Sequence, residues 1–475
     1  MAYGLVERRR RAVARAALYG SLVLVAAGTW AAHRYLHLPP GRKAEVAWRD
    51  VDWEQVPVVR VLQQYVRIDS SVDGDEYAAA LYLATPLEAA GIPVHVERVG
   101  ARGANLWAVL EGDDPEALVL LSHLDVEPAS EGGEWEHPPF AGVLEPPWLH
   151  GRGTFDMKSY TAAQLLALLE LKARHPRPAR TVVFLATSSE ERGSDLGMRW
   201  LLREHPELFE RVWAVLTEGG VVEARNLESL KYWGTEVGQK RYPEIVACAA
   251  TRERLEQLQA DIRNFNDRST GLTVDPAVRR FWQTYASTRD RETLRSLVAD
   301  PDALLHDPVR YLQLPRYLRQ MLRNDVAVLD PQRAPGGGWE MRLAFHLLPG
   351  ADLEAVRRER VPDWMTAAVA FREGAPVVPS GISSIDHPVV EAIAAEVERQ
   401  LGPVPSGPFF LTATATDSRF LRPLGIPAYG FSPFLILSTD TMHVGLPNER
   451  IAVTGLRQGA ELYARVVERL AAGGG

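Results

Sequence analysis

Residue types that bind divalent metal ions or move protons recur where apolar segments of this chain end. His123 and Asp125 follow "LVLLS", and the adjacent pair Glu190 and Glu191 follows "TVVFLATSS". Three further positions of this kind lie in "GRGTFD", "AVLTEGG" and "TDTMHVG", namely Asp156, Glu218 and His443. None of these segments has a Ser or Cys nucleophile in an elbow motif, so the set favours metal-dependent chemistry.

The number of these residues suits two ions better than one. Two ions about 3.5–4 Å apart share a bridging carboxylate, and each then needs one imidazole and one further carboxylate. Two acids remain after that count. One of the adjacent glutamates is left to act as a general base, and Asp125 is left to accept the other N–H of the His123 imidazole and fix its tautomer. The pair at 190–191 would thus divide metal binding and proton transfer between its members.

The segments between these positions alternate between helical and strand-like patterns. Helices are expected at 76–91 and 159–175, and strands at 92–99, 104–111, 116–122, 181–187 and 211–217. This rhythm predicts an α/β fold with a mostly parallel sheet and helices on both faces, similar to phosphorylase/hydrolase-like catalytic domains. Ligand sites of open α/β sheets form at the carboxyl ends of strands, where the candidate residues lie. Taken singly, each candidate has a purely structural explanation: a histidine at a strand end, acids in a solvated loop, or an aspartate in a turn. Such explanations do not account for all the candidates occurring together at strand ends.

The chain of 475 residues is too long for one ordinary core. Its pattern changes near residue 235 and returns to the α/β rhythm near 380. We therefore expect a catalytic domain in two parts, 41–235 and 379–475, interrupted by an α+β lid domain at 236–378. A net charge of −8 without a basic stripe in the main body argues against a nucleic-acid partner. The single cysteine, Cys248, excludes an internal disulfide and cysteine-rich metal sites.

Residues 1–40 are expected to be a basic cytoplasmic tail followed by a membrane anchor. The uncharged run at 16–32 has 17 residues, at the short edge of the roughly 17–25 that span a bilayer. Arginines at 8–11 and 15 precede it, which predicts a cytoplasmic N-terminus and an extracytoplasmic catalytic body. A cleaved signal peptide, giving a secreted or periplasmic protein, is the main alternative, and a buried core helix is a weaker one.

Taken together, the segments resemble the M20 metallopeptidase family. The resemblance covers about residues 50–235 and 380–460 and is carried, in order, by "SHLDVEP", "EWEHPPFAGVLEPPWLHGRGTFDMKS", "TSSEERGS", "TEGG", "TATDSRFLRPLGIPAYGFSP" and "MHVGLPNER". The apolar run near the N-terminus and "TEGG" are similar to the carboxypeptidase S and N-acyl-amino-acid hydrolase branch of that family.

This resemblance implies a role for each candidate residue. Glu190 would be the general base that activates water and then protonates the leaving amine, and Asp125 would orient His123. The peptide bond between Asp156 and Met157 would be cis. Two divalent ions are implied, with Zn²⁺ expected and Mn²⁺ or Co²⁺ as alternatives. The implied ligands are Asp156 as the bridge, His123 and Glu218 for one ion, and Glu191 and His443 for the other.

The expected lid departs from the family pattern. The family has a "GH-S" turn whose histidine stabilises the oxyanion, often across a dimer, but residues 206–305 contain no histidine. Arg333 of "RAPG" stands where the family has an asparagine, and His346 of "FHLLPG" stands where it has an arginine. Arg342, His346 and Arg419 are candidates to replace the missing groups, and a homodimer is left open.

The leading hypothesis is a membrane-anchored dizinc amidohydrolase or exopeptidase that acts on a small peptide or an N-acyl amino acid. The alternative is a catalytically impaired, M20-like, membrane-tethered binding or structural protein whose lid has lost its catalytic groups. A mononuclear or differently arranged aminopeptidase is disfavoured by the positions of "GRGTFDMKS" and "MHVG".

Overall fold

The structure is a computed structural model that describes residues 50–129, 134–226, 229–266, 272–286, 295, 299–374, 381–412, 414–436 and 443–473. All of them belong to one compact unit, Val46–Gly475. The expected tail and anchor at 1–40 lie outside the described residues, so they stay a prediction. Within the described ranges, no helix is both long enough and apolar enough to cross a membrane.

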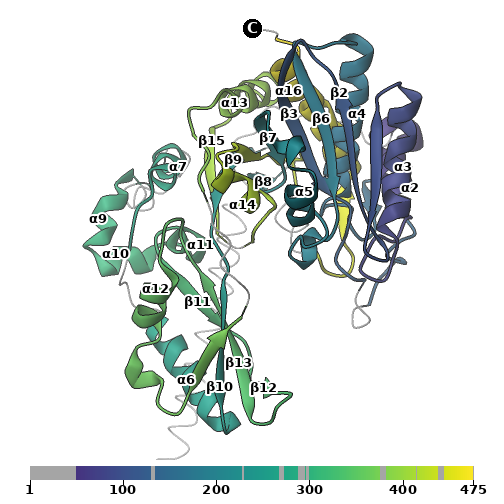
Figure 1. Ribbon diagram of the computed structural model, residues 1–475. Coiled ribbons are helices and arrows are strands. Elements are labelled where there is room, and N and C mark those ends of the chain that lie inside the picture. Colours follow the sequence, from purple (N-terminus) through teal and green to yellow (C-terminus); the bar gives the residue numbers. More distant parts are fainter. Residues whose placement is uncertain are drawn as a thin grey trace, which may run out of the picture. The chain divides into compact units, whose positions relative to one another are not determined.

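A nine-stranded sheet forms the centre of the catalytic part within these residues (Figure 1). Its spatial order is β1-β2-β6-β3-β7-β16-β9-β15, with β8 paired to β9. The strands are β1 Val94–Val99, β2 Gly103–Leu110, β3 Asp114–His123, β6 Arg180–Thr187, β7 Val212–Thr217, β8 Val221–Asn226, β9 Ser229–Gln239, β15 Ser406–Leu411 and β16 Ala428–Gly430.

The sheet is mixed, whereas the sequence pattern predicted a mostly parallel one. β3, β6, β7 and β16 run parallel to their neighbours among this group, but β1 and β2 pair antiparallel, as do β2 and β6. Only three residues join Val99 to Gly103. A connection this short permits a hairpin and no parallel crossover. The alternation of apolar segments therefore indicated the strands correctly and their directions only in the centre of the sheet.

Helices cover both faces of this sheet, which explains why its central strands are nearly continuous apolar runs. In β3, Leu118 and Leu120 pack in one core, and Val119 and Leu121 pack in a second core on the opposite face. The first core is completed by α2 Pro57–Val66, α3 Glu76–Ala89, α4 Lys158–Arg174, α13 Pro388–Leu401 and α16 Val453–Ala471, and the second by α5 Met198–Glu204 and α14 Ser418–Leu421.

A small three-stranded sheet has the order β17-β5-β4. It combines the hairpin of β4 Val143–Glu145 and β5 Trp148–His150 with β17 Arg450–Ala452 from far along the chain. The turn that follows β5 leads directly to Asp156. This sheet therefore ties the segment that carries Asp156 to the segment that follows His443.

The predicted insertion contains a second, antiparallel sheet with the order β11-β13-β10-β14, and β12 pairs with β13. Its α+β character agrees with the pattern in the sequence. The elements are β10 Glu244–Ala249, α6 Arg252–Asn266, β11 Asp325–Val328, β12 Gln332–Arg333, β13 Trp339–His346, α12 Leu353–Arg360 and β14 Ala370–Glu373. Four helices of the same region share a core with Tyr232 of β9 and Phe410 of β15: α7 Pro276–Ala286, α9 Pro301–Leu305, α10 Pro308–Gln313 and α11 Arg316–Gln320.

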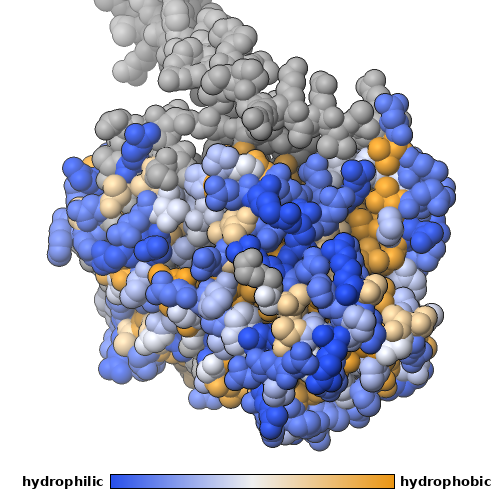
Figure 2. Space-filling model, turned by 90° about the horizontal axis from the view of Figure 1, so that it is seen from above, coloured by the Kyte–Doolittle hydropathy of each residue, from blue (hydrophilic) through white to orange (hydrophobic). Residues whose placement is uncertain are grey.

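Figure 2 shows a face on which hydrophilic residues dominate and hydrophobic residues form limited strips.

Lys240, the residue after β9, is buried where the second sheet begins. Its Nζ donates to the Arg323 carbonyl over 2.8 Å and lies 3.4 Å from Asp325 Oδ2. Burial lowers the pKa of Lys240 from 10.5 to about 8, and Asp325 opposes this shift.

Replacing Lys240 with methionine tests this burial. Between pH 8 and 10.5 the folded protein binds fewer protons at Lys240 than the unfolded chain does, so the wild-type free energy of unfolding rises with pH across that window. The variant lacks this contribution, which amounts to at most about 3 kcal/mol over the window. Chemical denaturation at a series of pH values measures the slope. Lys172→Met, which removes a surface ammonium group, is the control, and equal slopes for Lys240→Met and wild type would contradict the burial.

Candidate metal centre

Three neighbouring strands bring the candidate residues to one edge of the sheet. β6 and β7 both pair in parallel with β3, so the carboxyl ends of the three strands meet. His123 is the last residue of β3, and Glu218 directly follows β7. Glu190 and Glu191 open a short 3₁₀ helix, η3 Glu190–Arg192, just after β6. The sequence order of these strands thus becomes a spatial cluster.

His123 lies at the centre of this cluster. Its Nε2 is 3.2 Å from Asp156 Oδ1 and 3.8 Å from Glu218 Oε2. Two groups share this imidazole, and in each group one ligand atom per residue lies within 4.8 Å of the others. The first group is His123, Asp156 and Glu191, and the second is His123, Glu190 and Glu218. Five of the seven predicted site residues therefore lie in these two groups, which share the His123 imidazole.

Asp125 positions three neighbours at once. The His123 Nδ1 bonds to the backbone carbonyl of Asp125 at 2.9 Å, while the Asp125 carboxylate lies 3.6 Å from the same nitrogen. Its carboxylate oxygens accept from the backbone N–H groups of Glu190 (2.9 Å) and Glu191 (3.2 Å). These N–H groups open η3 and have no partner within the helix. The predicted orienting contact is present through the backbone, and the side chain instead holds the glutamate pair in place.

His443 belongs to neither of the two groups. Its Nδ1 contacts the Pro447 carbonyl at 3.1 Å. That contact places the imidazole proton on Nδ1 and leaves the lone pair of Nε2 available to a metal ion. The residues directly before it, 437–442, lie outside the described ranges. The predicted role of His443 as a ligand stays a prediction.

The clustered carboxyl groups repel one another in a buried place. Burial, followed by the charge of Asp156, raises the pKa of Glu191 to about 10. Burial also raises the pKa of Glu190 well above its usual range and raises that of Glu218. Burial alone lowers the pKa of His123, but its hydrogen bonds with acidic neighbours raise it well above the usual value. A site that holds these carboxylates ionised needs positive charge, and imidazole with carboxylates is the donor set that divalent ions such as Zn²⁺ take. The residues at this site therefore fit divalent metal binding.

Arg419 and Asp417 complete the polar surroundings of the glutamate pair. Arg419 Nη1 donates to Glu190 Oε1 at 3.0 Å, and Nη2 donates to Ser194 Oγ at 3.0 Å. Asp417 accepts from the hydroxyls of Ser194 and Thr187. Sequence reasoning named Arg419 only as one of three candidate replacements and gave Asp417 no role, although both lie in the matched segment "TATDSRF".

The backbone at Asp156 is held by a buried contact that the sequence did not reveal. Glu449 Oε1 accepts from the backbone N–H groups of Phe155 (2.9 Å) and Asp156 (3.2 Å). Its Oε2 pairs with Arg152 Nη1 at 2.8 Å, and both side chains are 1% exposed. The adjacent Asp156–Met157 peptide is cis, as the family resemblance implies. Glu449 stands in "MHVGLPNER", so its place in a matched segment was the available signal.

Comparison with known proteins places this arrangement in a family. The family model described as peptidase family M20/M25/M40 matches residues 119–469. The chain belongs to this family. The resemblance seen in the sequence is thereby confirmed, whereas the branch within the M20 family stays a prediction.

Relatives within the M20 family agree with this assignment. A succinyl-diaminopimelate desuccinylase from Methylobacterium sp. (strain 4-46) is 42% identical over 126 residues, which are 26% of this chain and 32% of that protein. The chain thus matches about a third of the length of such curated relatives. An M20 family metallo-carboxypeptidase, Sso-CP2 from Sulfolobus solfataricus, has a TM-score of 0.65 at 16% identity and covers 86% of this chain and 98% of its own.

Another solved structure shares the fold. The YXEP protein of Bacillus subtilis, described as a dinuclear metal binding peptidase, has a TM-score of 0.54 at 14% identity, with 87% of this chain and 97% of that chain covered. At such identities the two solved structures establish the shared fold and leave the substrate open.

The candidate lid groups differ in their surroundings. Arg342 lies 3.8 Å from Glu244 on the second sheet, and the His346 ring packs edge-on against Tyr242. Of the three candidates, Arg419 is the one whose hydrogen bond reaches a predicted site residue within the described part of the chain. It is therefore the best placed to act on groups bound at Glu190.

Replacing Glu449 with glutamine tests the buried ion pair. The change leaves the Arg152 guanidinium buried without a charged partner, which costs about 3–5 kcal/mol. It also weakens the hold on Asp156, so we expect a lower melting temperature together with a lower metal content after dialysis. Thermal unfolding and metal analysis of the same samples measure both effects.

The control is Glu461→Gln, which removes one carboxylate from an exposed ion pair with Arg457 on α16. Such exposed pairs contribute about 0–1 kcal/mol. A Glu449→Gln protein that matched this control in both stability and metal content would show that the pair does not position the site.

Proposed function

We propose that this protein is a dimetal-dependent hydrolase that cleaves the amide bond of a small peptide or an N-acyl amino acid. The observation that carries the proposal is the convergence of four acidic side chains on His123 at the carboxyl ends of three parallel strands. Membership of the M20 peptidase family supports the reaction class. The name of the desuccinylase relatives denotes removal of an acyl group from an amino acid, which supports an N-acyl substrate.

The residues that would hold the metal ions are Asp156, His123, Glu218, Glu191 and His443. When bound, such ions polarise a substrate carbonyl and make water a stronger acid. The protein contributes the geometry: the Asp125 carbonyl holds the imidazole, its carboxylate holds the glutamate pair, and Glu449 holds the backbone at Asp156.

Glu190 is the proposed proton carrier. Its side chain is 9% exposed, and burial raises its pKa well above the usual value while Arg419 opposes this shift. A carboxylate with a raised pKa is a better base and, once protonated, a donor that can return the proton to a departing amine near neutral pH. Arg419 holds one carboxylate oxygen at 3.0 Å and thereby fixes the direction of the other.

A second candidate function is ligand binding without turnover. The observation in its favour is the absence of histidine from residues 206–305, where the family places an oxyanion donor. Loss of one such donor typically costs about 10²–10³ in rate, which weakens an enzyme without abolishing it. Arg419 is a cation that hydrogen-bonds to Glu190.

Attachment to a membrane through residues 16–32, with the catalytic body outside the cytoplasm, is part of this proposal. It rests on the arginines that precede the apolar run. A homodimer remains an expectation from the family resemblance.

The variant Glu190→Ala tests the catalytic assignment. Loss of a general base removes about 10²–10⁴ in rate, while the proposed ligands remain, so we expect turnover to disappear and the bound metal to persist. The full-length protein, loaded with Zn²⁺ or Mn²⁺, is assayed on dipeptides and N-acyl amino acids, with metal content measured in parallel. Glu207→Ala, which removes an exposed glutamate, is the control. Wild-type turnover in Glu190→Ala would falsify the mechanism, and two bound ions without turnover on any substrate would favour the binding function.

Replacement of Arg419 by methionine should shift the pH dependence of turnover. The guanidinium favours the ionised form of Glu190, so its removal raises the pKa of that carboxyl group further. The acidic limb of the kcat/KM profile should then move to higher pH, with activity partly recovered in alkaline buffer. A loss of activity by the same factor at every pH would instead indicate that Arg419 acts on the substrate.

A further inference from the structure

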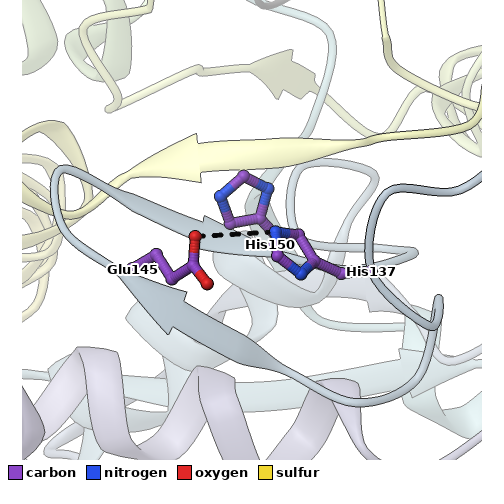
Figure 3. A group of neighbouring side chains, drawn as sticks. All are labelled: His137, Glu145 and His150. Carbon is purple, nitrogen blue, oxygen red and sulfur yellow. Dashed lines mark ion pairs between the residues drawn. The ribbon is translucent and has the colours of Figure 1, made fainter.

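A second group of metal-ligand residues lies on the small sheet, outside the site described above. Glu145 ends β4 and His150 ends β5, and the two strands pair antiparallel. Val143 is opposite His150 and Glu145 is opposite Trp148, so Glu145 and His150 are diagonal neighbours on one face of the hairpin. His137 comes from the loop before β4. Figure 3 shows the three side chains directed toward one another above the hairpin.

The distances within this group suit a common ion. His137 Nε2 lies 3.7 Å from Glu145 Oε2, and the two imidazole rings have centroids 4.6 Å apart at an angle of 57°. One ligand atom from each residue lies within 4.8 Å of the other two. Ligands at about 2.0–2.2 Å from a tetrahedral zinc ion are roughly 3.3–3.6 Å from one another. The separation of His137 and Glu145 is already close to this range, and rotation of the side chains would draw the ligand atoms together around an ion.

The three side chains differ in solvent exposure, and the most exposed of them has room to rotate. His150 is buried, with 8% of its surface exposed, whereas His137 is 25% and Glu145 is 64% exposed. The buried imidazole supplies a fixed ligand, and the exposed carboxylate is free to turn toward an ion. The side that faces solvent leaves positions for water, as in zinc sites with three protein ligands.

The charges around His150 favour a neutral ring. Burial lowers its pKa, and the neighbouring His137 and the Arg450 guanidinium lower it further, while Glu145 and Glu136 oppose them. Arg450 is the residue opposite His150 on β17, and its guanidinium lies over the Trp148 ring at 4.2 Å. A neutral imidazole offers a lone pair to a metal ion, whereas a protonated one does not. An ion pair between His137 and Glu145 explains the position of those two side chains, but it does not explain why the neutral His150 ring lies beside His137.

We infer that His137, Glu145 and His150 form a further metal site that binds one Zn²⁺ ion through two imidazoles and one carboxylate. The site is separate from the ligands proposed at the catalytic centre, and none of its residues is among them. A bound ion would tie the loop that carries His137 to the β4–β5 hairpin. This hairpin leads into the turn before Asp156, so the ion would stabilise the support of the catalytic segment and leave its ligands untouched.

The test is zinc stoichiometry and affinity of the full-length protein, measured by competition with a chromophoric chelator. Wild type should bind one Zn²⁺ more than His150→Phe, which keeps a packed ring but has no ligand atom. His137→Gln at a partly buried position and Glu145→Gln at an exposed one should each weaken that same ion by about tenfold or more, because removing a ligand costs at least as much as removing its outer partner. These two variants keep the test valid if His150→Phe does not fold.

His175→Gln is the matched control, because His175 also pairs with a glutamate, Glu468 at 3.2 Å, but belongs to no group of metal-ligand residues in the described part of the chain. It should bind as many ions as wild type. The inference depends on a difference of one ion between wild type and the variants, so it stands or falls independently of how many ions the catalytic centre holds. Equal stoichiometry and equal affinities in wild type, His137→Gln and Glu145→Gln would overturn it.

Discussion

Arg152 and Glu449 form a 2.8 Å ion pair almost out of reach of solvent, and the geometry of the candidate site depends on it. Removing two charges from water costs several kcal/mol for each ion, and such a pair persists where further hydrogen bonds offset the cost. Here Arg152 also donates to the carbonyls of Pro128 and Leu446, while Glu449 accepts from the backbone at Asp156. The pair thereby joins the segment after β3, the segment that holds Asp156 and the segment that follows His443. Three stretches that are distant in sequence and carry or adjoin proposed ligands are thus joined by one buried ion pair.

The arginines near this centre pair with Glu190 and Glu76, so they do not neutralise the acids around His123. Arg419 donates to Glu190, and Arg192 donates to Glu76. Burial raises the pKa of the Glu76 carboxyl group to about 7. Asp156, Glu191 and Glu218 instead surround the imidazole of His123. Protonating these acids or supplying divalent ions are the two ways to relieve their repulsion, and the second couples metal binding to the stability of the strand ends.

The sequence predicted the parts of this structure that local patterns determine. Apolar runs revealed β3, β6 and β7, because strands buried on both faces are apolar along their whole length. The acidic residues just after these runs revealed most of the centre, because the end of a strand can be recognised from the local sequence. The contact of Asp125 with His123 was expected from a spacing of two residues, but the atom that makes it was not, since spacing does not fix which oxygen faces a ring. The β1–β2 hairpin and the pairing of Glu449 with the backbone at Asp156 were missed for a related reason. Strand direction and contacts between residues almost 300 positions apart depend on the assembled fold and have no local signature.

The surroundings of Glu190 bear on whether the chain catalyses a reaction or only binds a ligand. A binding scaffold has no need for a carboxyl group that burial forces to a high pKa, because an alanine or glutamine there would avoid the desolvation cost. Yet Asp125 accepts from its backbone N–H, and Arg419 holds its carboxylate from the opposite end. Strongly perturbed acids aligned by partners on other segments are typical of groups that transfer protons. The departures from the family pattern that the sequence shows lie in the predicted lid, whereas the arrangement at Glu190 retains what proton transfer requires. This asymmetry favours an enzyme of altered specificity over a scaffold that has lost its chemistry.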